Sequence, residues 1–280
     1  MTLATLAMRR GTPADKPAVV ELARLIDPED YVISGYDYWM QEPEHAGLFV
    51  AELDGQIVGC HCIDWPAEAD AYFFGMRIHP GQQGKGIGSA YCRAQIEHAI
   101  GLGARNIYLT SKVHNLPAHR TVEKNGFVNL GENLCYEDEP LTIEPRPGRA
   151  RAARPEDLPL VHRFLQERKG KPLSGIISGR HDPWAIKSVT DSDWLLEDLV
   201  VVEGLDGLDG LMLCTIRSRR VLLRWLDGTP EAADDLLGYA AATGRSLLSL
   251  DLPKWAEPLL APLGLDPAKA FRTFVFHYRV

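Results

Sequence analysis

A glycine-rich turn between an apolar strand and a helix is the feature that most restricts the fold of this chain. The strand ends at Met76 to Ile78, and Gly84, Gly86 and Gly88 follow it. Closely spaced glycines let the backbone adopt positive φ and come near a ligand, so that successive N–H groups can point at one anion. A helix that begins here adds unpaired N–H donors and the positive end of its dipole. The segment therefore predicts a strand, a phosphate-binding turn and a helix.

The spacing of this turn argues against two common nucleotide loops. A Walker loop requires Gly-Lys-Ser/Thr, but Lys85 is followed by Gly86. A dinucleotide fingerprint requires a further glycine three places later, where Ser89 stands. A plain exposed turn is the structural alternative, although it needs only one or two special residues.

The pattern Gln83-x-x-Gly86-x-Gly88 after an apolar strand resembles the acyl-CoA loop of the GNAT N-acetyltransferases. A second segment, Asn115 to Phe127, is similar to the asparagine, short helix and Gly-Phe ending of the same family. This segment also has a mechanical interpretation, because a proline early in it suits a first helical turn and its glycine suits a left-handed cap.

The resemblance implies transfer of an acetyl group from acetyl-CoA, as co-substrate, to an amine by direct attack. Backbone N–H groups at Met76, Arg77 and Ile78 would polarise the thioester oxygen, and Asn115 would fix the pantetheine arm. For the Lys85 side chain, a phosphate contact and a solvated surface position both stay open. The implied diphosphate-binding residues are Gln83, Gly84, Lys85, Gly86, Ile87, Gly88 and Ser89.

The residues for proton transfer are less well marked. Val122 stands where the family often has a tyrosine acid. An alkylammonium group must lose its proton before it attacks, and His114, next to the predicted central strand, is the proposed base. His61 and Asp64 are alternatives, and for each histidine a purely structural role is the competing interpretation.

The second half of the chain repeats the plan of the first. The pattern Pro13-x-Asp15-x-Pro17-x-Val19 recurs as Pro155-x-Asp157-x-Pro159-x-Val161. At the place of the phosphate turn, Thr229 and Pro230 open a helix without the glycine pattern. We expect two tandem GNAT-like α/β domains, each a mixed, mostly antiparallel twisted sheet flanked by helices: residues 1–145 catalytic, and residues 146–280 degenerate, forming a substrate wall or packing support.

Periodicity and turn signals give the predicted elements of the first half. Asp54-Gly55 is a two-residue hairpin signal between two of the strands. The predicted strands are 7–10, 47–53, 56–64, 72–79, 106–111, 127–129 and 134–137, and the predicted helices are 13–25, 36–41, 89–100 and 117–125.

Charge and composition limit the classes of binding partner and the location that we expect. A net charge of −8 argues against nucleic acid and is compatible with a cationic amine. No apolar run approaches the ~20 residues of a membrane span, so we expect a cytoplasmic protein, monomer or homodimer. The five cysteines are too scattered for a disulfide framework or a zinc site, which predicts reduced core residues and no metal.

The acceptor is indicated only by the aromatic segment from Tyr31 to Pro43. Together with residues 75–78 it is similar to histidine N-acetyltransferase relatives, which implies a small amine such as an amino acid. An amphipathic packing helix is the alternative. Two other functions stay open: a protein lysine or N-terminal acetyltransferase, and a catalytically silent CoA-binding sensor.

Overall fold

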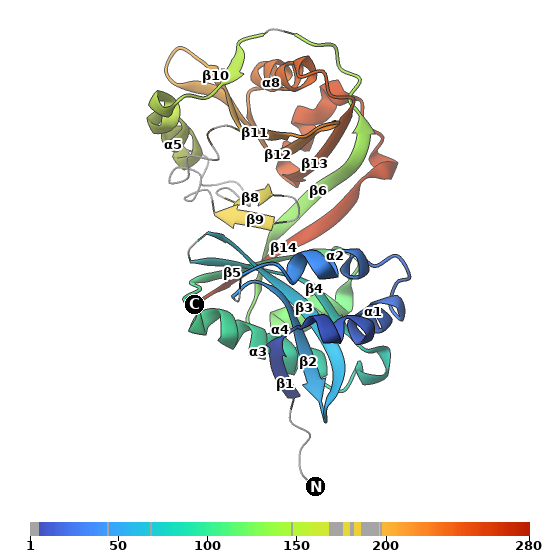
Figure 1. Cartoon of the computed structure of the whole chain (residues 1–280). Helices are drawn as coiled ribbons and strands as arrows, with labels where there is room; N and C mark the ends of the chain where they lie inside the picture. The colour runs from blue at the N-terminus through green and yellow to red at the C-terminus, as the bar shows by residue number, and fades with distance from the viewer. Residues whose placement is uncertain are drawn as a thin grey trace. The chain divides into compact units, whose positions relative to one another are not determined.

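The computed structural model describes residues 6–280 except 44, 68, 147, 168–175, 180–181, 186–195 and 197. The chain forms two compact units (Figure 1). Unit 1 comprises Met1–Ser111, Asn115–Asn129 and Phe276–Val280, and unit 2 comprises Lys112–His114 and Leu130–Val275. The compact units are interleaved along the chain, because residues 276–280 are part of unit 1.

The sheet of unit 1 is antiparallel except for one parallel pair. Its strands lie in the order β1-β2-β3-β4-β5, and the C-terminal strand β14 follows β5. Among β1 to β5, only β4 and β5 run parallel. The strands are β1 (Leu6–Arg10), β2 (Gly47–Leu53), β3 (Gln56–Ala67), β4 (Asp70–Ile78), β5 (Asn106–Lys112) and β14 (Phe271–Arg279).

Helices cover both faces of this sheet. Val32 and Tyr36 of α2 pack with Cys60 and Cys62 on one face, where α1 also lies. Tyr91 of α3 packs on the other face, because alternate residues of a strand point to opposite sides. The helical segments are η1 (Pro13–Asp15), α1 (Lys16–Arg24), α2 (Tyr31–Trp39), η2 (Pro80–Gln82), α3 (Ile87–Gly101) and α4 (Leu116–Lys124).

Most predicted elements of the first half of the chain are confirmed, and three are corrected. The hairpin between β2 and β3 turns at Asp54 and Gly55, whose φ values are 52° and 78°. The helix predicted at 36–41 instead spans Tyr31–Trp39, because the Asp30 side chain accepts a hydrogen bond from Val32 N and caps it. The two strands predicted at 127–129 and 134–137 are one long strand, β6 (Val128–Pro140).

The described part of unit 2 repeats much of this order, from a first strand and helix through three antiparallel strands to a helix and a parallel strand. Its sheet runs β14-β6-β13-β12-β11-β10-β7, and β12 and β13 are its parallel pair. As predicted, Thr229 caps α8 by accepting a hydrogen bond from Ala232 N at 3.1 Å, and Pro230 is the first residue of that helix. The elements are β7 (Ala150–Ala152), η3 (Pro155–Asp157), α5 (Leu158–Glu167), β10 (Leu199–Glu203), β11 (Leu208–Ile216), β12 (Arg220–Gly228), α8 (Pro230–Ala242), β13 (Leu247–Pro253), η4 (Lys254–Leu263) and η5 (Pro267–Lys269), with a separate hairpin of β8 (Ile176–Gly179) and β9 (Asp182–Ala185).

An arginine–aspartate network is built in the same way in both units. Arg9 donates to both carboxylate oxygens of Asp15, at 2.7 and 2.8 Å. Arg151 does the same to Asp157, at 2.7 and 2.9 Å. Each aspartate also accepts a backbone hydrogen bond from the residue three places before it. The sequence repeat is therefore repeated in structure at the start of each first helix.

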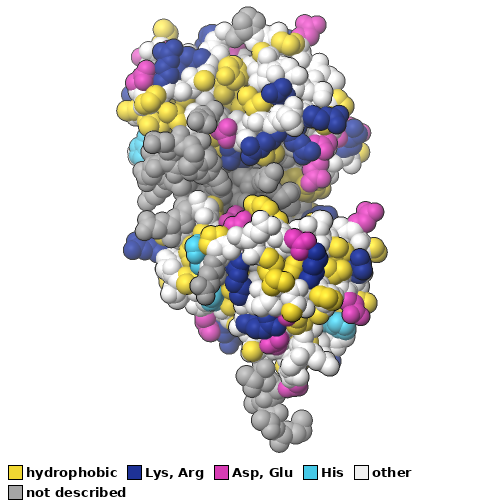
Figure 2. All heavy atoms as spheres, viewed as in Figure 1, with side chains coloured by type: hydrophobic (Ala, Val, Ile, Leu, Met, Phe, Trp, Pro, Cys, Tyr) yellow, Lys and Arg dark blue, Asp and Glu magenta, His cyan; other side chains and the backbone are white. Residues whose placement is uncertain are grey.

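The cysteines are buried, and the surface drawn in Figure 2 carries charges of both signs. All five cysteines are buried and free, as predicted. On the face drawn in Figure 2, lysine and arginine side chains lie interspersed with aspartate and glutamate. In the described part of the chain, no helix is both long and apolar enough to cross a bilayer.

Candidate functional site

A β-bulge interrupts β4 in the middle of unit 1. The pairing of β3 with β4 shifts register between Cys60 and Cys62. Two residues of β4, Gly75 and Met76, therefore stand opposite His61 of β3. Gly75 has a φ of 65°, a conformation that glycine adopts without strain. A bulge of this kind bends the strand and turns its backbone groups in new directions.

The parallel strands β4 and β5 separate just before this bulge. Their ladder runs from Asp70 opposite Asn106 to Phe73 opposite Leu109. Beyond Phe73, β4 continues to Ile78 with no strand paired on its β5 side in this fully described stretch. The bulged backbone consequently lies at an open edge in the middle of the sheet.

The turn that follows β4 is open and depends on glycine. Gly84 and Gly86 have φ values of 75° and 84°, and a Cβ added to either would meet no atom within 4 Å. No side chain caps α3, a helix of 15 residues that starts at Ile87. The backbone N–H groups of Gly84 to Ser89 find no acceptor among the described residues. Such an uncapped terminus is a favourable site for an anionic group.

Side chains hold this turn in place. Gln83 Nε2 donates to Ile78 O at 3.0 Å and so ties the turn to the end of β4. Lys85 Nζ donates to Gln82 Oε1 at 3.2 Å, on the exposed side of the turn. Ser89 Oγ accepts a hydrogen bond from Asn125 Nδ2 at 3.0 Å, which links α3 to α4. The structure thus brings Met76 to Ile78 and Gln83 to Ser89 together as one continuous strand, turn and helix start.

The side chain of Arg77 has a structural partner. Its Nε donates to Asp30 Oδ2 at 2.6 Å, and its Nη2 donates to Asp30 Oδ1 at 3.1 Å. Burial lowers the pKa of Arg77, but the hydrogen bonds to Asp30 and the electrostatic effect of the neighbouring acidic groups together outweigh burial, so the net pKa is raised. The ion pair therefore ties the start of α2 to β4 immediately after the bulge.

His61 is a core residue and does not face solvent. Its Nδ1 lies 2.7 Å from Tyr91 Oη, which donates to Phe49 O at 3.1 Å. Since that phenol has only one proton to give, Nδ1 must be the donor to it. Burial lowers the pKa of His61 well below its usual value, and nearby His98 lowers it further. A neutral, enclosed imidazole of this kind is unsuited to take a proton from an arriving amine.

Asp64 is the more accessible of the two alternative bases. It lies on β3 opposite Tyr72, on the face that α1 and α2 cover. Its carboxylate accepts a hydrogen bond from Trp65 N at 2.8 Å. Burial is the main cause that raises the pKa of Asp64.

The remaining predicted residues, which follow β5 in the chain, have separate surroundings. Asn115 caps α4, accepting a hydrogen bond from Ala118 N at 3.4 Å, and is itself exposed. Val122 is buried in unit 1 at 5% exposure. His114 is exposed, belongs to unit 2, and forms no hydrogen bond within the described part of the chain.

Sequence reasoning missed the bulge at Gly75 and the role of Asp30. Gly75 stands inside a strand, and a glycine there is a recognised signal of a bulge. Asp30 directly precedes an aromatic helix, and aspartate is a preferred N-cap. Neither signal alone says which distant strand the residue contacts. Within the described residues, no group of three or more His, Cys, Asp or Glu side chains is placed to hold a metal ion.

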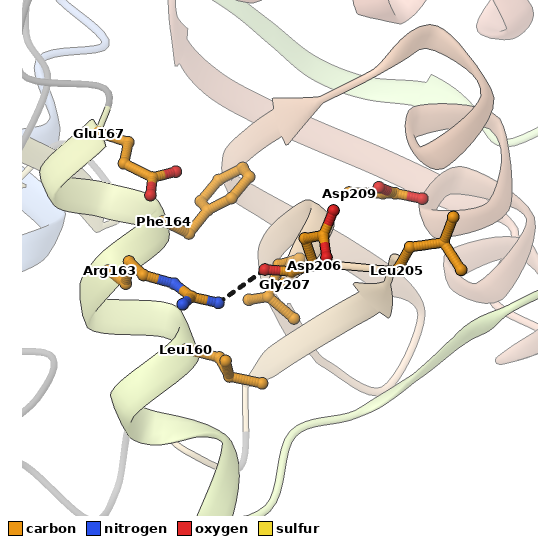
Figure 3. A pocket seen from close by; sticks show the side chains of 9 residues that line it. Leu160, Arg163, Phe164, Glu167, Leu205, Asp206, Gly207 and Asp209 are labelled. Atoms are coloured by element: carbon orange, nitrogen blue, oxygen red, sulfur yellow. Dashed lines mark hydrogen bonds between the residues drawn. The ribbon is translucent and has the colours of Figure 1, made fainter.

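A separate cavity of about 410 Å³ lies in unit 2 (Figure 3). It is bounded by α5 and by the hairpin between β10 and β11. Arg163 Nη2 donates to Asp206 O at 2.8 Å across it. None of the predicted site residues lines this cavity, whose lining consists of Leu160, Arg163, Phe164, Glu167, Leu205, Asp206, Gly207, Leu208 and Asp209.

Part of this chain is similar in sequence to known acetyltransferases. Over 97 residues it is 34% identical to a mycothiol acetyltransferase of Streptomyces coelicolor, a segment that covers 34% of this chain and 31% of that protein. A mycothiol acetyltransferase of Thermomonospora curvata is 28% identical over 95 residues, 34% of this chain and 32% of its own length. The match thus spans about a third of these relatives.

Solved structures are similar over nearly the whole chain. A GCN5-related N-acetyltransferase of Sphaerobacter thermophilus has a TM-score of 0.61 at 14% identity and covers 98% of this chain and 95% of its own. One from Kribbella flavida has a TM-score of 0.52 at 15% identity, covering 99% and 71%. At such identities the likeness concerns the fold. The Acetyltransferase (GNAT) family matches residues 16–127, the part that carries the bulge and the glycine turn. Residues 16–127 of this chain are therefore a GNAT-family acetyltransferase domain.

Proposed function

We propose that this chain transfers the acetyl group of acetyl-CoA to a primary amine of a small molecule, such as an amino acid. The observation that carries the proposal is the open glycine turn at the uncapped start of α3, directly continuous with the bulged open edge of β4. Both features lie within the residues that match the acetyltransferase family.

The two features suit the two ends of acetyl-CoA. The N–H groups of Gly84 to Ser89 would bind the diphosphate, because they lie at the uncapped, positive end of α3. The thioester would lie along the open edge of β4, where a backbone N–H near Met76 can donate to its oxygen. A donor aimed at a developing oxyanion contributes on the order of 3 kcal/mol.

The acceptor class rests on two observations. The relatives that match residues of this chain are named for mycothiol, a small molecule. The net charge of −8 favours the arrival of a cationic amine. The amine must then lose a proton, and we propose His114 or Asp64 as the base. Comparison of His114→Ala with Asp64→Asn decides between them, since loss of the base moves the pH–rate profile.

The test has a binding arm and a turnover arm. Calorimetry measures acetyl-CoA binding, and release of the CoA thiol is measured with amino acids, polyamines, aminoglycosides and lysine-bearing peptides as acceptors. The proposal expects acetyl-CoA binding and thiol release with at least one small amine. Binding without release from any acceptor would instead indicate a CoA sensor, and release with peptides alone a protein acetyltransferase. Absence of binding by the folded protein would refute the proposal.

A further inference from the structure

The hydroxyl group of Tyr31 lies next to the bulge of β4. Tyr31 is the first residue of α2. Its Oη lies 3.5 Å from the position that a Cβ would take on Gly75. Because Gly75 has no side chain, none of its atoms separates this hydroxyl from the bulged backbone. The phenol is thus a polar group beside the place where the proposed thioester would react.

Two contacts of the ring, and the anchoring of the residue before it, hold Tyr31 in this position. Its ring meets that of Trp39 edge to face, with the centroids 6.1 Å apart. The guanidinium carbon of Arg77 lies 5.2 Å from the centroid of the same ring. The preceding residue, Asp30, binds Arg77 and caps the helix. A side chain fixed in this way presents its polar end with little entropy left to lose on binding.

The two faces of the sheet separate the two substrates. Met76 and Ile78 pack toward the face of Tyr91 and α3. A coenzyme bound at the start of α3 therefore reaches the bulge from that face. Tyr31 lies on the opposite face, since the Gly75 position also neighbours Cys62 there. The face that carries Tyr31 is the one left for the acceptor.

The hydroxyl can form the hydrogen bond that an amine requires. Burial is the main cause that raises the pKa of Tyr31, so the group keeps its proton at neutral pH. A protonated phenol can accept a hydrogen bond through its oxygen and donate another. The residue as a whole is 49% exposed, so Tyr31 is accessible from solvent.

From this placement we propose that Tyr31 is a positioning residue for the acceptor, accepting a hydrogen bond from the amine N–H at the bulge. The inference rests on the proposed function. In the transfer, the nitrogen lone pair forms the bond to the carbonyl carbon, the C–S bond breaks, and sulfur leaves with its electron pair. The extra proton on nitrogen passes to water, and Tyr31 keeps its own proton throughout.

The test compares two tyrosines. Tyr31→Phe removes only the hydroxyl and keeps the ring contacts. Tyr239→Phe is the matched control, because Tyr239 belongs to α8 of unit 2 and packs against the core of that unit. The probe is whichever small amine of the panel above releases CoA thiol fastest from the wild type. In Tyr31→Phe, kcat/KM for that amine should fall about tenfold, the loss of one hydrogen bond. The Kd for acetyl-CoA, measured by calorimetry, should stay unchanged, as should both parameters in Tyr239→Phe.

Two results would overturn the inference while leaving the proposed function intact. One is a wild-type kcat/KM for the amine in Tyr31→Phe. The other is a parallel weakening of acetyl-CoA binding, which would place the hydroxyl on the coenzyme side or indicate general disorder of the site. A wild type that releases no thiol with any amine would refute the proposed function itself, and the inference with it.

Discussion

The ion pair between Asp30 and Arg77 is the contact on which the geometry of the site depends most directly. The Asp30 side chain is only 1% exposed. It accepts hydrogen bonds from Arg77 Nε at 2.6 Å, from Arg77 Nη2 at 3.1 Å and from Val32 N at 2.9 Å. Removing this one carboxylate breaks a buried ion pair and removes the cap of α2 together.

The expected cost follows from these contacts. Breaking a buried ion pair by removing one partner costs about 3–5 kcal/mol. The Arg77 side chain is 21% exposed, so water recovers part of its loss and the lower end of that range applies. Loss of an N-cap adds about 1 kcal/mol. Asp30→Ala should therefore lower the free energy of unfolding by about 4 kcal/mol. Asp30→Asn, which retains a capping oxygen, should lower it by about 2 kcal/mol.

Urea unfolding monitored by circular dichroism measures this loss, with unchanged m-values as the check that the same transition is compared. Asp37→Ala is the control from the same helix. The Asp37 side chain is 71% exposed and pairs with Lys16 at 2.5 Å. Surface pairs of this kind contribute about 0–1 kcal/mol. If Asp30→Ala and Asp37→Ala lower stability equally, the reasoning from burial is wrong.

Three further outcomes are expected. Gly86→Ala should weaken acetyl-CoA binding by about tenfold, because a φ of 84° costs a residue with a Cβ about 1–2 kcal/mol. Gly101→Ala is the control, since Gly101 is helical and has open space around the added Cβ. It should bind acetyl-CoA as the wild type does in the same calorimetry. Because the pKa of His61 is lowered by burial, only the unfolded chain takes up a proton as pH falls below about 6.5, and stability should fall by about 1.4 kcal/mol per pH unit until the folded state is also protonated. The urea midpoint of the wild type should therefore be lower at pH 5.5 than at pH 7.5, and that of His61→Phe should change less. Equal midpoints at the two pH values in both proteins would contradict this prediction. Asp157→Ala should destabilise the protein by about 2 kcal/mol through loss of its arginine and backbone partners, yet leave the Kd for acetyl-CoA unchanged, since Asp157 lies in unit 2.

The helix α2 illustrates where sequence reasoning stops. The aromatic spacing predicts a helix at 36–41, but the helix begins at Tyr31. Asp30, the residue before it, can be predicted as an N-cap from the sequence. Its ion pair with Arg77, 47 residues away, cannot be predicted from the local sequence pattern. His61 shows the same limit, because its burial against Tyr91 depends on the packing of α3 over β3.

The sequence by itself determined the local features of this protein: the glycine turn, the hairpin at Asp54 and Gly55, the cap of α8, and the repeat in unit 2. These depend on backbone preferences and hydrogen bonds among residues close in the chain, which a short stretch of sequence specifies. Only the tertiary structure decided that β4 bulges opposite His61, that Tyr31 ends at that bulge, and that the end of the chain belongs to unit 1. Strand register and side-chain burial arise from contacts between distant segments, and many such pairings are compatible with the same local pattern.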